Sequence, residues 1–367
     1  MDLDRAARVC FAPSYAAARA RFRDACAALG LAVESRSLPG HRGPGGEELA
    51  SDWTWIGPDD ARFVTVVMSA THGVEGFCGS GGQIAWLLSG APAALPRDCA
   101  VLVVHAVNPF GFAWESRTTE ENVDLNRNWI DFAAAAPVNA EYDELAAHLV
   151  PASLDGPVRG EADAALRRWR ATRDEKAWRV AMSCGQYRHP SGLFYGGAAP
   201  SWSRRHEEDL IERYALARRG AVAAIDLHTG LGPYGYGEPN CHHPDGGRSL
   251  ARARRLWGDS VTEPAKGTSV SVRRTGLTMH GWSRLLGDNL AFVTLEFGTR
   301  PHEQVFEALR RDAWCRGRGL DAADPAQRRV REVMRDAFAP DADSWREMVC
   351  FRTQQMIRQA LERLPEG

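Results

Sequence analysis

A histidine and a glutamate stand three residues apart in the string THGVEG, residues 71–76 of this 367-residue chain. The string directly follows an apolar run, ARFVTVVMSA, that ends at residue 70. On a turn leaving a buried strand, His72 and Glu75 can converge on one cation. Catalytic zinc commonly takes two histidines and one glutamate, with one position left open for water. An H-x-x-E pair alone is a weak signal, because a solvated surface histidine is its ordinary explanation, but its place at a strand end favours a metal site.

Two further ionisable residues end apolar runs in the same way. His228 lies in AIDLHTG, where Asp226 is on the same strand face and can orient an imidazole. Taken alone, His228 is more simply a buried structural histidine. Glu296 lies in VTLEFG, and an ionisable group at the end of a buried strand costs desolvation unless something nearby uses it. A general base with a tuned pKa is one such use.

An arginine and a polar string lie between the first two of these sites. Arg117 is followed by VDLNRNW, residues 123–129. Arginines near a metal suit the binding of a carboxylate and the stabilisation of an oxyanion, because the guanidinium group is always charged and presents a fork of donors. A carboxylate such as Asp124 suits the role of fixing the tautomer of a ligand histidine.

The elements that must position these residues are short, continuous apolar runs. They cover residues 61–70, 100–107, 221–227 and 290–295. Such runs are typical of strands in a sheet buried on both faces, and the helical patterns between them predict α/β architecture. Open α/β sheets place their sites at the carboxyl ends of the strands, where each of these runs delivers a polar residue.

We expect one catalytic domain over residues 1–367. A polar, Ala- and Arg-rich stretch with helical periodicity, residues 131–193, interrupts the series of strands and is predicted to be a helical insertion. Residues 324–364 are predicted to form C-terminal helices broken at Pro340. The breakers in residues 38–46, LPGHRGPGG, predict a loop.

Taken in order, these elements resemble the zinc carboxypeptidase superfamily, which also contains aspartoacylase and succinylglutamate desuccinylase. VDLNRNW is close to the family signature and is the most specific match. The H-x-x-E pair, DLHTG and LEFGT match the metal ligands and the catalytic glutamate, and FYGGAAPSWSRRHEEDL is similar to a segment that precedes the third ligand. The matching pieces span about residues 63–298. More narrowly, the chain resembles a bacterial branch whose function was unassigned.

The resemblance implies a three-layer α/β/α fold with a mixed, mostly parallel central sheet. It implies that Zn²⁺ is the cofactor and that its ligands are His72, Glu75 and His228. Glu296 is then expected to activate water and to pass the proton to the leaving amine. Arg117 is expected to polarise the scissile carbonyl.

For the substrate, the resemblance implies that Asn126 and Arg127 hold a carboxylate and that Asp124 supports His72. The chain departs from the family in one place, because no tyrosine occurs between Tyr236 and Glu296, where carboxypeptidases carry a mobile one. Either Arg273 or Arg274 occupies that place, and His280 falls in the region that shapes specificity in the family.

We therefore expect a hydrolase that cleaves an amide bond next to a free carboxylate. The departure leaves two substrate classes open, a small peptide and an N-acyl amino acid, and thus carboxypeptidase or deacylase activity. A non-catalytic binding protein that kept the fold is a further alternative. The sequence makes no prediction of oligomeric state.

Other enzyme classes fit less well. A serine or cysteine hydrolase would use Ser80 or Cys78 in GFCGSGG, but the chain has no G-x-S-x-G string. Small residues there more simply allow close packing of a helix on the sheet. An H-E-x-x-H metalloprotease is excluded, because neither His206 nor His302 is followed by a second histidine at the required spacing.

Composition excludes some partners. The formal net charge of −2 gives no bulk electrostatic case for binding nucleic acid or an anionic membrane surface. No stretch approaches the ~18 uncharged apolar residues of a membrane helix, and the N-terminus lacks the apolar core of a signal peptide. The eight cysteines are scattered without a C-x-x-C pair. We expect a cytoplasmic protein.

Overall fold

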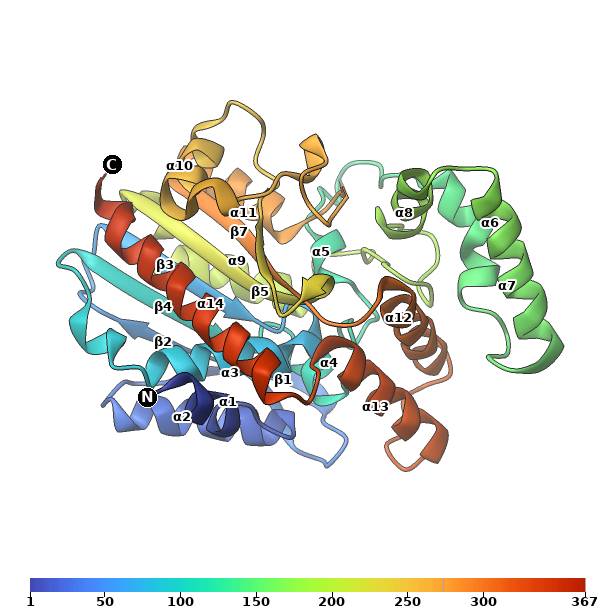
Figure 1. Cartoon of the computed structure of the whole chain (residues 1–367), viewed down its shortest axis with the longest axis horizontal. Helices are drawn as coiled ribbons and strands as arrows, with labels where there is room; N and C mark the ends of the chain where they lie inside the picture. The colour runs from blue at the N-terminus through green and yellow to red at the C-terminus, as the bar shows by residue number, and fades with distance from the viewer. Residues whose placement is uncertain (273, 367) are drawn as a thin grey trace.

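A seven-stranded mixed sheet forms the centre of the computed structural model, which describes residues 1–272 and 274–366. The strands follow the order β1-β2-β4-β3-β5-β7-β6 across the sheet (Figure 1). Their bounds are β1 Glu34–Arg42, β2 Glu48–Ile56, β3 Phe63–Ser69, β4 Cys99–His105, β5 Ala221–Tyr234, β6 Gly237–Asn240 and β7 Leu290–Gly298.

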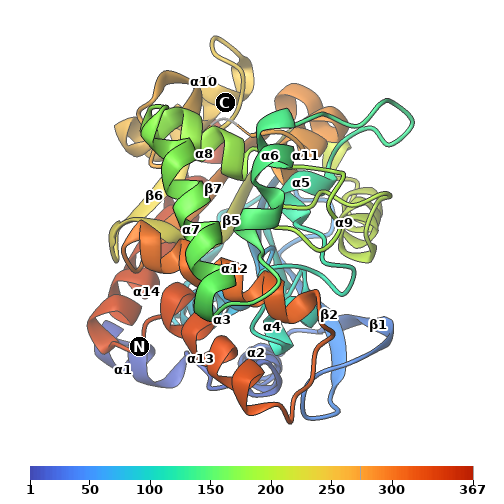
Figure 2. The same ribbon diagram turned by 90° about the vertical axis from the view of Figure 1, so that its right-hand side faces the viewer.

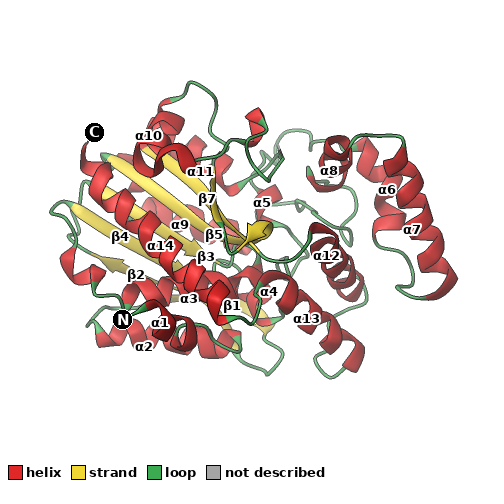
Figure 3. Cartoon of the chain, in the orientation of Figure 1, coloured by secondary structure: helices red, strands yellow, loops and turns green. Residues whose placement is uncertain are grey.

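The four predicted apolar runs are the parallel centre of this sheet. β3 pairs in parallel with β4 and β5, and β5 pairs in parallel with β7. Helices cover both faces (Figure 3). Their bounds are α1 Leu3–Val9, α2 Tyr15–Ala28, α3 Gly76–Leu87, α4 Pro109–Ala113, α5 Leu125–Asn128, α6 Ala140–Leu149, α7 Gly156–Ala171, α8 Glu175–Ser183, α9 Trp202–Arg213, α10 Arg248–Trp257, α11 Thr278–Leu286, α12 His302–Arg316, α13 Pro325–Phe338 and α14 Asp343–Arg363.

Two apolar clusters hold the layers together, and each lies on one face of the sheet. Side chains such as Val67 and Val103 pack with residues of α1, α2, α3, α10 and α14. Side chains such as Val66 and Val222 pack on the opposite face with residues of α9 and α11. Because both faces are covered, both faces of these strands are mostly apolar, and the alternation that marks a half-exposed strand is absent. The predicted three-layer α/β/α fold with a mixed, mostly parallel sheet is confirmed.

The antiparallel edges of the sheet were not predicted. β2 pairs antiparallel with both β1 and β4, and β6 pairs antiparallel with β7. The loop predicted for residues 38–46 was wrong in its first half, because β1 continues to Arg42 with a shift of register after Ser37. An edge strand tolerates Pro39, since the missing N–H can face solvent.

Three helices, α6, α7 and α8, occupy the predicted insertion and stand beyond the carboxyl ends of the parallel strands (Figures 1 and 2). Their buried side chains, including Tyr142, Leu166 and Trp178, join a third apolar cluster with residues of α12 and α13. The insertion is therefore packed on the body at the edge of the sheet where α/β proteins place their sites.

Within the described residues, no helix is long and apolar enough to cross a membrane. Each of the eight cysteines is a free thiol.

Candidate metal centre and active site

A sharp turn after β3 brings His72 and Glu75 to the carboxyl edge of the sheet. Ala70 adopts a left-handed backbone with φ of 60°, which turns the chain away from the strand direction. The next residues form a single tight turn, Gly73–Glu75, that leads into α3. A Cβ atom at Gly73 would lie 2.0 Å from the carbonyl carbon of Gly111, so this position requires glycine.

The same turn is bound to the segment that carries Arg117. The N–H of Gly73 donates to the carbonyl oxygen of Arg117 at 3.1 Å, and the N–H of Val74 donates to that of Ser116 at 2.9 Å. Residues more than forty positions apart in the sequence are thereby held in one unit. This backbone pairing places the arginine beside the candidate metal ligands.

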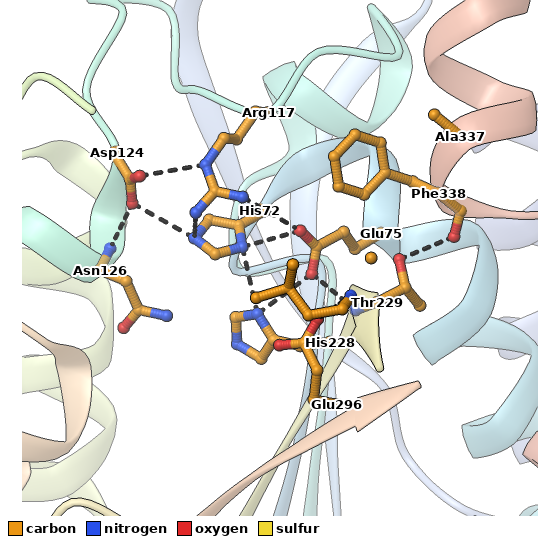
Figure 4. A network of polar contacts seen from close by, with 12 residues as sticks. His72, Glu75, Arg117, Asp124, Asn126, His228, Thr229, Glu296, Ala337 and Phe338 are labelled. Carbon is orange, nitrogen blue, oxygen red and sulfur yellow. Dashed lines mark hydrogen bonds and ion pairs between the residues drawn. The ribbon is translucent and has the colours of Figure 1, made fainter. Parts of the chain in front are cut away.

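The other two candidate residues come from neighbouring strands in matching register. His228 of β5 is the direct partner of Glu296 in β7. In parallel strands, partnered residues point to the same face, and both residues lie near the carboxyl end of the regular pairing, which runs to Gly230 and Gly298. The register therefore places a histidine next to a glutamate, as Figure 4 shows.

His72, Glu75 and His228 converge, and their ligand atoms lie within 4.8 Å of one another. The Nδ1 atoms of the two histidines are 3.1 Å apart. Glu75 reaches both imidazoles, with Oε1 2.9 Å from Nδ1 of His72 and Oε2 3.1 Å from Nδ1 of His228. All three side chains are buried.

This set fits a zinc ion. Zinc–nitrogen bonds of about 2.0–2.1 Å in a tetrahedron place neighbouring ligand atoms roughly 3.3 Å apart, close to the separations in this cluster. If both rings carry their proton on Nε2, the two Nδ1 lone pairs face each other and the Glu75 carboxylate, and a cation satisfies all of these acceptors. Two histidines and one carboxylate are also the donor set of an open catalytic zinc site.

Carboxylates hold the far nitrogens of both imidazoles. Asp124 Oδ1 lies 3.2 Å from Nε2 of His72, and Asp226 Oδ2 lies 2.6 Å from Nε2 of His228. Thr71 donates to the other oxygen of Asp226 at 2.8 Å. These contacts place the proton of each ring on Nε2 and leave Nδ1 free as a metal ligand.

Arg117 completes this network. Its Nε donates to Asp124 Oδ2 at 3.0 Å, and its Nη2 lies 2.8 Å from Nε2 of His72. One tautomer of His72 cannot serve both neighbours, since Asp124 needs an N–H on Nε2 and Arg117 needs a lone pair there. A metal on Nδ1 selects the contact with Asp124, and it leaves Nη2 of Arg117 available to another acceptor.

The electrostatics of the carboxyl groups differ across the site. Burial opposes ionisation of Asp124, but the positive charges of Arg117 and Arg127 outweigh it and hold the pKa of that carboxyl well below its usual range. Burial, together with the negative charge of Glu75, raises the pKa of Glu296. A raised pKa suits a group that must both accept and return a proton near neutral pH.

Glu296 is also fixed in position. Its Oε1 accepts the N–H of Leu231 at 3.0 Å, and the residue is 7% exposed, at the wall of a cavity. The candidate metal ligands and Arg117 line the same cavity. The site therefore has a base, a cation and a metal-binding cluster around one space.

Other residues line this cavity that the sequence did not point to. Its polar wall includes Asn240 and His242, and its apolar wall comes from α8, α12 and α13 together with neighbouring loops, with Met182, Phe194, Val305, Phe306, Leu309 and Phe338. Arg179 of α8 also faces it. Helical periodicity in the insertion does not mark these residues, because nothing local distinguishes a helix face that covers a site from one that covers a core.

The predicted substrate-binding residues are placed differently from one another. Asn126 lines the cavity. Arg127 is fully buried and is not among the lining residues. His280 is half-buried, with its ring 6.4 Å from that of His242, behind the cavity wall. Of the two arginines proposed to replace the tyrosine, Arg274 lines the cavity, and Arg273 lies outside the described residues.

The residues considered for a serine or cysteine hydrolase lie away from this cavity. Ser80 Oγ is 2.9 Å from Nε2 of His105, but both side chains are buried, and the ring of Phe22 in α2 stacks on that of His105. Burial lowers the pKa of His105 to about 4 and raises the pKa of the Cys78 thiol well above its usual range. A buried thiol that stays protonated is a poor nucleophile.

A family model matches residues 11–352, which is most of the chain. The chain belongs to the family described as protein of unknown function DUF2817. No curated protein matches the chain. The family assignment agrees with the predicted branch of unassigned function and adds no activity of its own.

Several solved structures match the chain at low sequence identity. Bovine thrombin-activatable fibrinolysis inhibitor, in complex with tick carboxypeptidase inhibitor, matches with a TM-score of 0.51 and 10% identity over 97% of this chain and 98% of the other. The metallo-carboxypeptidase of Pseudomonas aeruginosa matches at 0.38 with 13% identity, over 92% and 68% of the two chains. Murein-tripeptide amidase of Escherichia coli O157 matches at 0.37 with 17% identity, over 84% and 94%.

The first of these matches establishes the fold of the zinc carboxypeptidase superfamily for this chain. The predicted resemblance is therefore confirmed at the level of the fold. The predicted ligands His72, Glu75 and His228 form a group of described residues that could hold a metal ion. Substrate and reaction are inferred from the site alone.

Proposed function

We propose that this protein is a zinc-dependent hydrolase that cleaves an amide bond next to a free carboxylate in a small substrate. The observation that carries the proposal is the convergence of His72, Glu75 and His228 at a cavity that Glu296 also lines. An open His-Glu-His zinc site with a carboxylate base beside it is the arrangement of a metallohydrolase.

Each residue then has a role that follows from its position. When zinc is bound, it polarises the scissile carbonyl and lowers the pKa of a bound water toward about 7. Glu296 accepts a proton from the attacking water and returns it to the leaving nitrogen as the C–N bond breaks. Arg117 donates from Nη2 to the carbonyl oxygen as negative charge develops there.

The walls of the cavity support a small, anionic substrate. Arg117 and Arg274 line it with donors that can face a ligand, whereas Arg179 donates to the carbonyl oxygen of Val270. The carboxylates in the lining are Glu75 and Glu296. Because Glu75 is taken up by the metal cluster, the remaining charge favours an anion. Residues of helices α8 and α12 form part of the cavity wall. We therefore expect a short substrate to fit better than an extended polypeptide.

A second candidate is deacylation of N-acyl amino acids. The apolar wall with Met182, Phe306 and Leu309 favours it, since it offers an acyl chain a place to pack. A carboxypeptidase would place an apolar side chain against the same wall. The two candidates share the metal, the base and the requirement for a carboxylate.

The decisive experiment measures metal and turnover together. We expect one zinc per chain in the purified protein, little zinc in His72→Ala, and release of amino acid from short peptides or from N-acyl amino acids. The better substrate class separates carboxypeptidase from deacylase. Equal zinc in both proteins would overturn the assignment of the ligands. Stoichiometric zinc without hydrolysis of either class would favour a binding protein.

A further inference from the structure

The arginine that the signature string supplies is already engaged. Arg127 donates from Nη1 to the carbonyl oxygen of Asn126 at 2.5 Å and from Nη2 to that of Ser183 at 2.6 Å. Its side chain is fully buried, and the ring of Phe194 lies over the guanidinium group at 5.4 Å. Ser183 is the last residue of insertion helix α8. The Nε of Arg127 is buried without a partner. Ser183 and Phe194 line the cavity, whereas Arg127 is not among the lining residues.

Arg274 is in the opposite situation. It lines the cavity, yet within the described residues it donates no hydrogen bond and forms no ion pair, and its Nε is buried without a partner. Burial, reinforced by the positive charges of Arg127 and Arg117, lowers the pKa of Arg274 to about 9. The Arg274 side chain is half-buried, and its guanidinium group has no acceptor among the described residues, so an anion in the cavity can supply one.

The loop that carries Arg274 is anchored to the signature string. The backbone N–H of Trp129 donates to the carbonyl oxygen of Gly276 at 3.1 Å, and the backbone N–H of Thr278 donates to Asn126 Oδ1 at 3.0 Å. A Cβ atom at Gly276, where φ is +67°, would lie 2.3 Å from the carbonyl oxygen of Arg127, so the two segments touch. Arg274 is therefore held on a packed loop rather than on a free one.

The same contact orients the amide of Asn126. Its oxygen accepts from Thr278, which leaves the NH₂ group as the end that can face the cavity (Figure 4). An amide donor and a guanidinium fork at one cavity are complementary to a carboxylate, which accepts hydrogen bonds on both oxygens.

We propose that Arg274, together with the amide of Asn126, binds the free carboxylate of the substrate, and that Arg127 is a positioning residue that ties the signature string to helix α8. The substrate class is then an amide whose leaving amine carries a carboxylate, such as an amino acid. This inference rests on the proposed function for the reaction but not for the binding, and the two can be tested apart.

The test measures binding of matched acids and amides to zinc-loaded Glu296→Gln protein, in which turnover is suppressed. The probes are N-acetyl derivatives of leucine, phenylalanine, glutamate and lysine, each as the free acid and as the amide, titrated by calorimetry. We expect at least one acid to bind more tightly than its amide. Arg274→Gln should weaken binding of that acid about 10–200-fold and change binding of the amide little. Arg274→Lys should restore part of the loss, because a point charge lacks the planar fork.

Arg179→Gln is the matched control. Arg179 also lines the cavity, but its guanidinium donates to the carbonyl oxygen of Val270, so its loss should affect acid and amide alike. Equal weakening of both by Arg274→Gln, or no preference for any acid in the parent protein, would overturn the inference. A protein that holds no zinc yet prefers acids through Arg274 would refute the proposed function and leave this inference standing.

Discussion

Replacement of Glu296 by glutamine isolates the base from the rest of the site. The amide is nearly isosteric with the carboxyl group, and its oxygen can still accept the N–H of Leu231, which is 3.0 Å from Oε1. It cannot accept a proton at neutral pH. The candidate metal ligands are separate side chains, so the change leaves the donor set for zinc intact.

The expected loss follows from the role of the base. General-base help contributes typically about 10²–10⁴-fold, so kcat should fall by that factor, which corresponds to about 3–5 kcal/mol in activation free energy. Folding stability should not fall. Burial and the nearby charge of Glu75 raise the pKa of Glu296, which means that the fold disfavours its ionised form, and the substitution removes that charge.

Three measurements on the same preparations are needed: kcat on the best amide substrate, zinc content by elemental analysis, and the thermal unfolding midpoint. The expected pattern is a large loss of kcat with full zinc and an unchanged or higher midpoint. Near wild-type turnover with full zinc would show that another group takes the proton. Loss of zinc together with activity would show that Glu296 supports the metal, and the assignment of its role would be wrong.

Two further predictions concern groups outside the cavity. Asp226→Asn should weaken zinc binding about 10–100-fold in competition with a chelator, because Asp226 fixes the tautomer of His228 through a 2.6 Å contact; unchanged affinity would contradict this role. Burial raises the pKa of Glu207 well above its usual range, so the stability that its proton provides is present in acid and is lost as pH rises through that pKa. Glu207→Gln keeps an acceptor for Nε1 of Trp282, which lies 2.8 Å from Glu207 Oε2, and should gain stability over wild type with rising pH, by about 1.4 kcal/mol for each unit of pKa shift. A difference in unfolding midpoint that stays constant between pH 4 and pH 8 would contradict the second prediction.

The helical insertion connects these predictions to specificity. Arg179 and Met182 of helix α8 line the cavity, and the carbonyl oxygen of Ser183 accepts a hydrogen bond from the guanidinium group of Arg127. The insertion therefore forms part of the cavity wall and also provides a hydrogen-bond acceptor for Arg127 of the signature string. Changes in this segment are expected to alter which substrates bind more than how the amide bond is cleaved.

Much of the site could be predicted from the sequence, because the apolar runs before His72, His228 and Glu296 indicate parallel strands, and the carboxyl ends of parallel strands meet at one edge of a sheet. The edge strands were harder to predict. β2 includes Asp52 within a strand of otherwise mostly apolar and aromatic residues, and β1 includes Pro39, so neither has the composition of a buried strand.

Which of two arginines lines the cavity could be read only from the tertiary structure. Arg127 and Arg274 have the same side chain, and the signature string favours the first. In the structure, Arg127 donates to the carbonyl oxygens of Asn126 and Ser183, whereas Arg274 lines the cavity. Residue type and strand position determine which chemical groups arrive at the edge of the sheet. Whether a buried guanidinium group is free to bind a ligand depends on the carbonyl oxygens that packing places near it, because buried donors pair with such acceptors. These acceptors come from distant segments of the chain.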